Sequence, residues 1–223
     1  ACLLTGQYPL THGLFLNDQR LNTRATSFAQ ALGRAGYDTG YIGKWHIDGT
    51  GRSAYIPPER RQGFDYWKVL ECTHNYNKSR YFDRKGQDPR TWEGYDAYAQ
   101  TRDAVTYIRN HGAATAENRK PFSLFLSWGP PHDPYRTGPT KWLELYARKQ
   151  LTIRENVPAQ IRKQAQLTYA GYYAHCSALD ECVGWLMTAL RETGQLENTI
   201  VVYTSCLLYT SDAADEEDSV DLG

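Results

Sequence analysis

The chain has 223 residues, of which 41% are hydrophobic, 13% aromatic and 22% charged. This composition supports a folded core and excludes a disordered chain, and without a run of eighteen apolar residues we expect no membrane span. The net charge is zero only because residues 206–223 carry six acidic side chains and no basic one; the rest has 25 basic against 19 acidic residues. A mildly basic body fits an anionic ligand, although many proteins share it.

The first half of the chain predicts a helix, a strand and a long irregular segment. Residues 26–36 have capping-box spacing between Ser27 and Gln30 and end at Gly36, with an apolar stripe at Phe28, Ala31, Leu32 and Ala35. A buried strand ending at Ile42 follows at once. Residues 48–90 are rich in Gly, Pro, Arg and aromatic residues, which favours a surface loop or insertion.

The second half predicts two helices and two strands. Residues 95–111 favour a helix whose inward positions are Tyr98, Ala104 or Val105, and Ile108. The run "PFSLFLSW" (121–128) is typical of a strand buried in a parallel sheet, and "NTIVVYTS" (198–205) predicts a third buried strand. Between them, residues 161–191 predict a long helix with a core-facing stripe at Tyr172, Cys176, Leu179, Val183, Leu186 and Leu190. The alternation indicates an α/β fold.

Titratable side chains follow two of these strands. Lys44 and His46 stand two residues apart in "GYDTGYIGKWH", and residues two apart in an extended segment face the same side. His132 follows the run 121–128 in a turn stiffened by Pro131 and Pro134. Because ligands of α/β sheets bind beyond the carboxyl ends of the strands, the three groups predict an anion site. Each alone would equally fit a solvated lysine or a structural histidine.

Four segments resemble the sulfatase family, in the family's order. "GYDTGYIGKWH" resembles its second signature, and "ACLLTGQYPLTHG" resembles the end of its first, Cys-x-Pro-Ser-Arg signature. "PFSLFLSWGPPHDPY" is similar to the family's strand and Pro-His-x-Pro turn. "LDECVGWLMTALRETGQLENTIVVYTS" is similar to the helix and strand that deliver an Asp-His or Asp-Asn metal pair.

The resemblance implies an alkaline-phosphatase-like α/β fold, a central, mostly parallel sheet flanked by helices, with residues 1–205 as a partial sulfatase catalytic domain. It implies hydrolysis of sulfate esters by a formylglycine made from the signature Cys, together with a divalent cation, usually calcium. Lys44 would bind sulfate and the nucleophile's oxygen. His46 would assist the aldehyde hydrate and sulfate release. His132 would contact sulfate and the leaving oxygen as a candidate acid.

The sequence also departs from the family pattern. We expect the nucleophilic Cys, its Arg and the N-terminal acidic metal pair to precede Ala1, and we reject Cys2 as the nucleophile. After "VVYTS" the family continues with Asp-His-Gly or Asp-Asn-Gly, whereas this chain continues with an acidic tail, 206–223, which we expect to be non-native. We assign no metal ligand, and we expect the 223-residue chain by itself to release no sulfate.

Two other functions stay open, namely a phosphonate or phosphate ester hydrolase of the same superfamily and a non-catalytic anion- or glycan-binding module. Candidate substrate-binding residues in the irregular segment are Arg60, His74 and Asn77, which equally fit a solvated loop. The expected partner is a sulfated small molecule or glycan, with no nucleic acid and no prediction of oligomeric state. Family habit favours a periplasmic or extracellular location, which no residue here shows.

Overall fold

The computed structural model describes residues 1–22, 24–115 and 120–205 of the chain. The helices in this part are α1 (Cys2–Thr5), α2 (Pro9–His12), α3 (Phe28–Arg34), α4 (Asp96–Ala113), α5 (Thr140–Ala147) and α6 (Arg162–Glu192). The strands are β1 (Asp38–Lys44), β2 (Tyr66–Leu70), β3 (Arg80–Asp83), β4 (Arg90–Thr91) and β5 (Phe122–Ser127). Short 3-10 helices are η1 (Pro58–Arg60), η2 (Tyr135–Thr137), η3 (Ala159–Ile161) and η4 (Leu196–Asn198).

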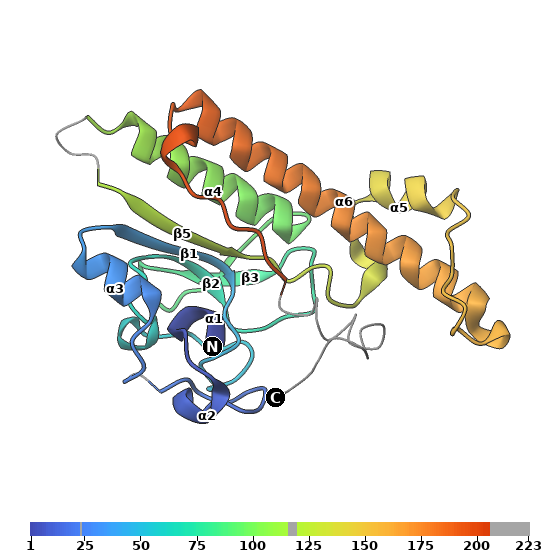
Figure 1. Cartoon of the computed structure of the whole chain (residues 1–223), viewed down its shortest axis with the longest axis horizontal. Helices are drawn as coiled ribbons and strands as arrows, with labels where there is room; N and C mark the ends of the chain where they lie inside the picture. Colours follow the sequence, from blue (N-terminus) through green and yellow to red (C-terminus); the bar gives the residue numbers. More distant parts are fainter. Residues whose placement is uncertain (23, 116–119, 206–223) are drawn as a thin grey trace, which may run out of the picture.

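The strands form one sheet in the order β4-β3-β2-β1-β5. Strand β1 is parallel to both β2 and β5, whereas β3 and β4 are added antiparallel at one edge. The helices α4 and α6 cover one face of the sheet and α3 lies on the other (Figure 1). This arrangement confirms the predicted α/β fold with a mostly parallel sheet flanked by helices.

Strand β1 is buried on both faces, as its apolar sequence requires. Tyr41 points into an aromatic cluster with Trp45, Phe64 and Trp67 on the side of α3. Its neighbour Ile42, fully buried, joins the cluster that packs under α4. The central strand is therefore held by two cores, which fixes where its carboxyl end, and the residues after it, come to lie.

Two predicted helices form as expected, with shifts in which residues they bury. In α3 the capping box of Ser27 and Gln30 is present, but the buried residue is Ala29, one position from the predicted stripe. In α6 Leu179 and Leu190 are buried as predicted, whereas Tyr172 is 42% exposed. The small residues of α6, among them Ala174 and Ala178, are buried instead, because they let α6 approach its neighbours closely.

Two predictions about strands were wrong. The segment 48–90 is not simply a loop, since it contains β2, β3 and β4. The predicted strand 198–205 is not formed: Asn198 ends η4, residues 199–205 have no regular structure, and Ile200 is 93% exposed. An apolar run becomes a strand only where another strand pairs with it, and within the described residues none does. The acidic tail 206–223 lies outside the described residues. No described helix is long and apolar enough to cross a membrane.

Candidate active site

Strands β1 and β5 bring the predicted site residues to the same edge of the sheet. The two strands run parallel in direct register, with Gly43 opposite Ser127. Lys44 is the last residue of β1, and His132 follows the end of β5 in a turn. The close pairing depends on Gly43, because its φ is +111° and a Cβ there would lie 2.0 Å from the Ser127 carbonyl oxygen.

Lys44 and His46 lie together. The prediction assumed an extended strand through both residues, whereas β1 ends at Lys44. Lys44 and His46 are half-buried while the intervening Trp45 is buried. His46 adopts a positive φ of 53°, which is uncommon for a residue with a side chain. Burial and the Lys44 ammonium lower the pKa of His46, so its neutral form is favoured, while the carboxylate of Asp18 opposes this effect.

The backbone around His46 is fixed by the end of β2. The His46 N–H donates to the Glu71 carbonyl oxygen at 2.8 Å, which extends the strand pairing past Lys44. The buried carboxylate of Glu71 accepts hydrogen bonds from the N–H groups of Asp48 and Gly49 at 2.9 and 3.1 Å. Burial raises the pKa of Glu71, although these N–H groups favour its ionised form. Glu71 thus holds the backbone of His46 and of the turn that follows it.

An ion-pair chain covers the other side of His46. His46 Nε2 lies 3.2 Å from Asp18 Oδ1, and Asp18 also accepts from Arg52 at 3.0 Å. Hydrogen bonds from Arg52 and His46 lower the pKa of the Asp18 carboxyl. Arg60, a predicted substrate ligand, directs its Nε at the buried Asp48 carboxylate at 3.1 Å. Its guanidinium is therefore already engaged by the loop that follows His46.

His132 is oriented by the residue that follows it. Its Nδ1 lies 2.7 Å from Asp133 Oδ1 and 3.0 Å from the Asp133 carbonyl oxygen. A proton on Nδ1 is thus held by Asp133, which leaves Nε2 for other contacts. The turn contains cis peptide bonds before Pro131 and Pro134.

The segment after β2 packs on the His132 turn and carries two further predicted residues. The imidazole rings of His74 and His132 are stacked with centroids 4.8 Å apart. Beneath them, the Tyr76 hydroxyl donates to the Asp133 carbonyl oxygen at 3.0 Å, and Asn77 Nδ2 donates to the Thr137 carbonyl oxygen at 3.0 Å. The predicted residues thus form a Lys44–His46 group and a His132–His74 group at one sheet edge.

The structure adds functional candidates that the sequence did not reveal. Asp133 directly follows His132, so its position was a usable signal. Asp18 pairs with His46 across 28 residues, and Glu71 meets the 46–49 turn only because β2 lies beside β1. No local sequence pattern predicts either contact.

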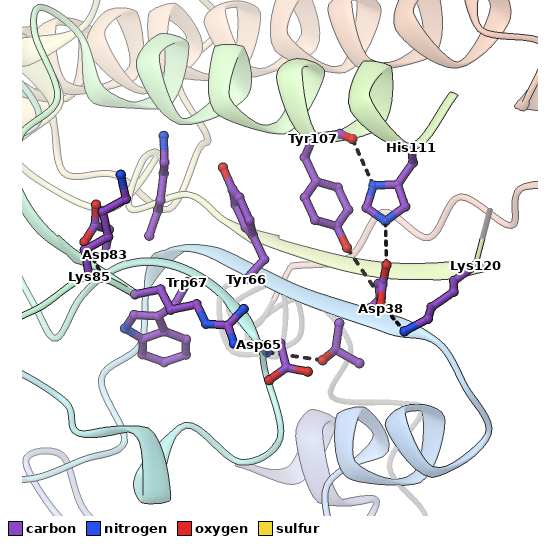
Figure 2. A pocket seen from close by; sticks show the side chains of 12 residues that line it. Asp38, Asp65, Tyr66, Trp67, Asp83, Lys85, Tyr107, His111 and Lys120 are labelled. Carbon is purple, nitrogen blue, oxygen red and sulfur yellow. Dashed lines mark hydrogen bonds and ion pairs between the residues drawn. The ribbon is translucent and has the colours of Figure 1, made fainter. Parts of the chain in front are cut away.

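A pocket of about 560 Å³ lies at the opposite edge of the sheet, where β1 and β5 begin (Figure 2). Asp38 in its wall accepts from His111 Nε2 at 3.2 Å, and Lys120 lies 3.6 Å from the same carboxylate. These ion pairs tie the end of α4 to the starts of β1 and β5. The pocket is remote from Lys44, which ends the same strand, so we do not assign the predicted chemistry to it.

A metal centre is not assembled by the residues in the described ranges. Among them, no group of three or more His, Cys, Asp or Glu side chains is placed to hold a metal ion. The acidic residues near His46 are instead engaged by Arg52, Arg60 and backbone N–H groups. The described residues therefore do not fit a calcium centre.

The sheet order defines an α/β protein whose candidate site lies beyond the carboxyl ends of parallel strands, where such proteins bind their ligands. The sequence model of the sulfatase family matches residues 1–205, and the chain belongs to this family. An ulvan-active sulfatase of Formosa agariphila is 42% identical over 205 residues, which cover 92% of this chain and 39% of that protein. This chain therefore spans well under half of that relative's length.

Solved structures agree with the family assignment. A Bacteroides thetaiotaomicron sulfatase, from a locus for the metabolism of multiple glycosaminoglycans, is 28% identical with a TM-score of 0.75, over 86% of this chain and 45% of that one. A phosphonate monoester hydrolase of Silicibacter pomeroyi shares the fold at 18% identity, with a TM-score of 0.56 over 89% of this chain and 50% of that one. The expected alkaline-phosphatase-like fold is thereby confirmed.

Proposed function

We propose that the complete protein hydrolyses sulfate esters of carbohydrates at the edge of the sheet defined by Lys44 and His132. One observation carries this proposal: in a sulfatase-family chain, two parallel neighbouring strands deliver Lys44–His46 and His132–Asp133 to one edge. A lysine ammonium and imidazole N–H groups are suited to a sulfate, whose oxygens are acceptors and whose charge grows on the leaving oxygen as the S–O bond breaks.

The environments of these residues support different roles. Lys44 supplies a fixed positive charge for the sulfate. His46, biased towards its neutral form by burial and Lys44, assists at the nucleophile. His132 presents Nε2 while Asp133 holds Nδ1, so His132 contacts the sulfate and protonates the leaving oxygen. The formylglycine and calcium typical of the family remain proposals for the complete protein.

A sulfated glycan is the substrate class we propose. The Formosa relative is named for its action on ulvan, and the Bacteroides structure comes from a locus for glycosaminoglycan metabolism. Of the three candidate substrate residues, Arg60 and Asn77 already serve protein contacts. The exposed His74 stacks on His132 and forms no hydrogen bond within the described ranges, so it is the best placed to meet a saccharide.

The test uses the protein expressed from its complete gene in a host that makes formylglycine. We expect sulfate release from ulvan oligosaccharides, and a fall in kcat/KM of about 10²-fold or more in Lys44→Ala and His132→Ala. Lys120→Ala and His111→Ala, at the opposite sheet edge, are matched controls that keep their activity. Cleavage of phosphonate monoesters without sulfate release would support the rival hydrolase, and binding without any turnover would support the glycan-binding module.

A further inference from the structure

The helices α5 and α6 form an arm that extends past the carboxyl ends of β1 and β5 (Figure 1). We define the arm as residues 135–173, from η2 to the first part of α6. It contains five tyrosines, and its charged residues are seven basic ones (Arg136, Lys141, Arg148, Lys149, Arg154, Arg162, Lys163) and two acidic ones (Glu144, Glu155). The arm therefore carries a surplus of positive charge, of which the Lys141 ammonium is paired with Glu181 of α6.

The tyrosines of the arm form a continuous row of rings. The ring of Tyr135 lies 6.0 Å from that of Tyr172, and Tyr172 lies 6.1 Å from Tyr173. Tyr173 then contacts Tyr146 at 5.7 Å and Tyr169 at 6.3 Å. Tyr172 and Tyr173 are 42% and 39% exposed, so the row is not a buried core. Adjacent exposed aromatic rings offer flat apolar faces to a ligand.

The row begins at the candidate active site. Tyr135 is the third residue after His132, and it is held against α6 by a close backbone approach. A Cβ at Gly171 would lie 2.3 Å from the Tyr135 carbonyl oxygen, so only glycine permits this contact. The neighbouring Thr137 carbonyl accepts the hydrogen bond from Asn77. The row of rings therefore starts in the segment that directly follows His132 and continues onto α6.

The far end of the row joins a basic groove. The Lys149 ammonium lies 5.2 Å from the centre of the Tyr146 ring, and the Lys149 carbonyl accepts from Gln166 Nε2 at 2.8 Å. Gln166 lines a groove of about 340 Å³, whose other walls are Gln150, Leu151, Ile153, Arg162 and Lys163. The row of tyrosine rings is thus followed directly by a groove lined with cationic side chains.

This combination selects one class of ligand. A sulfated polysaccharide carries sugar rings whose apolar faces stack on tyrosine and sulfate groups that pair with lysine and arginine. The arm also exposes Leu145, Ile161 and Leu167, but these side chains are interspersed with the basic residues, whereas the core of a protein–protein interface is depleted of charge. We propose that the arm binds the sulfated polysaccharide chain beyond the sugar whose ester is cleaved. This inference rests on the proposed function, since it extends the same substrate along the surface.

The test measures binding by the full 223-residue chain and needs no turnover. Ulvan oligosaccharides are titrated calorimetrically into wild type and into the double variant Tyr172→Ala/Tyr173→Ala at about 0.1 M salt, where surface charges still act. We expect the variant to raise Kd about tenfold. Lys149→Gln/Lys163→Gln should also raise Kd and flatten its dependence on salt, because fewer charges meet the polymer.

Matched controls are Tyr37→Ala, an exposed tyrosine at the start of β1, and Arg34→Gln at the end of α3, both of which keep the wild-type Kd. An unchanged Kd in the tyrosine variant, or no ulvan binding by wild type, overturns the inference. Tighter binding of single-stranded DNA than of ulvan overturns it in favour of a nucleic-acid surface. Sulfate release from ulvan oligosaccharides by the complete protein, measured separately, shows whether the proposed function fails or only the arm.

Discussion

Asp96 is a buried carboxyl group whose ionisation the fold opposes, and it supports the segment that carries His74. It is 1% exposed at the start of α4, accepts one hydrogen bond from Ser79 at 3.1 Å, and its N–H donates to the Tyr76 carbonyl oxygen. Burial raises the pKa of Asp96 from 3.8 to about 7, although Ser79 and first-turn N–H groups favour the ionised form. We predict that Asp96→Asn stabilises the protein at neutral pH.

The sign and size follow from proton linkage. Below pH 3.8 the carboxyl is protonated in both the folded and the unfolded chain, and its contribution to stability is fully present. As pH rises towards about 7, the unfolded chain ionises first and the contribution is lost. A pKa raised by about three units, at about 1.4 kcal/mol per unit, lowers the free energy of unfolding by at most about 4 kcal/mol at neutral pH. The Asp96→Asn substitution removes this loss but weakens the contact with Ser79, which subtracts about 1 kcal/mol from the gain.

The assay is urea unfolding of wild type and Asp96→Asn from about pH 4 to about pH 8. The free-energy difference between them isolates Asp96, because all other titrating groups are common to both. We expect this difference to grow from near zero to about 3 kcal/mol in favour of the variant. Asp65→Asn, an exposed carboxylate, is the control. A difference that does not change with pH would refute the argument that burial governs this group.

Three further predictions concern the site. Asp18→Asn should lower the pKa of His46 further, because the Asp18 carboxylate raises it; NMR titration of labelled histidine measures this. Gly43→Ala should destabilise the protein by more than about 3 kcal/mol, measured by urea unfolding, because its Cβ would overlap the Ser127 carbonyl. Tyr76→Phe should cost about 1 kcal/mol in the same assay, since it removes one hydrogen bond to the turn after β5.

Each of these has a control within the chain. The five other histidines report in the same NMR spectra, and an upward shift of His46 would contradict the assigned role of Asp18. Gly33→Ala lies in a helix with open space around its Cβ and should stabilise by up to about 1 kcal/mol. Tyr37→Phe, at an exposed site, should change nothing. A Gly43→Ala protein as stable as wild type would show that the strands can separate without loss.

Sequence patterns predicted correctly those helices and strands that are specified by their own residues. The bounds of α6 and the strands β1 and β5 follow from periodicity and continuous apolar runs. Strand β2, "YWKVL", contains good strand formers. It was not predicted, because the composition of the whole segment 48–90 is dominated by turn-forming residues. The opposite error occurred at 198–205, where a strand was predicted and none forms. Strand formation also depends on a pairing partner, which the segment's own sequence does not reveal.

The same distinction divides the candidate site. Lys44, His46 and His132 were predicted as site residues because each lies at or soon after the end of an apolar strand in the sequence. Their partners arrive through packing: Asp18 reaches His46 by a distant loop, and His74 reaches His132 because the segment after β2 packs on the turn after β5. Sequence patterns thus nominated the candidate side chains, whereas the tertiary structure was needed to find the residues that set their orientation.

The two site histidines differ in their surroundings, and this difference assigns them different tasks. His46 is half-buried beside Lys44, its pKa is lowered, and its contact with Asp18 is shared with Arg52. His132 has a carboxylate of its own, Asp133, at 2.7 Å, and its ring is stacked on the imidazole of His74. The Asp133 contact holds Nδ1 of His132 and leaves its Nε2 for a bound ester, whereas His46, whose pKa is lowered by burial and by Lys44, is the better proton acceptor. We therefore propose that His46 accepts a proton at the nucleophile and that His132 contacts the leaving oxygen, which is the division of labour that ester hydrolysis requires.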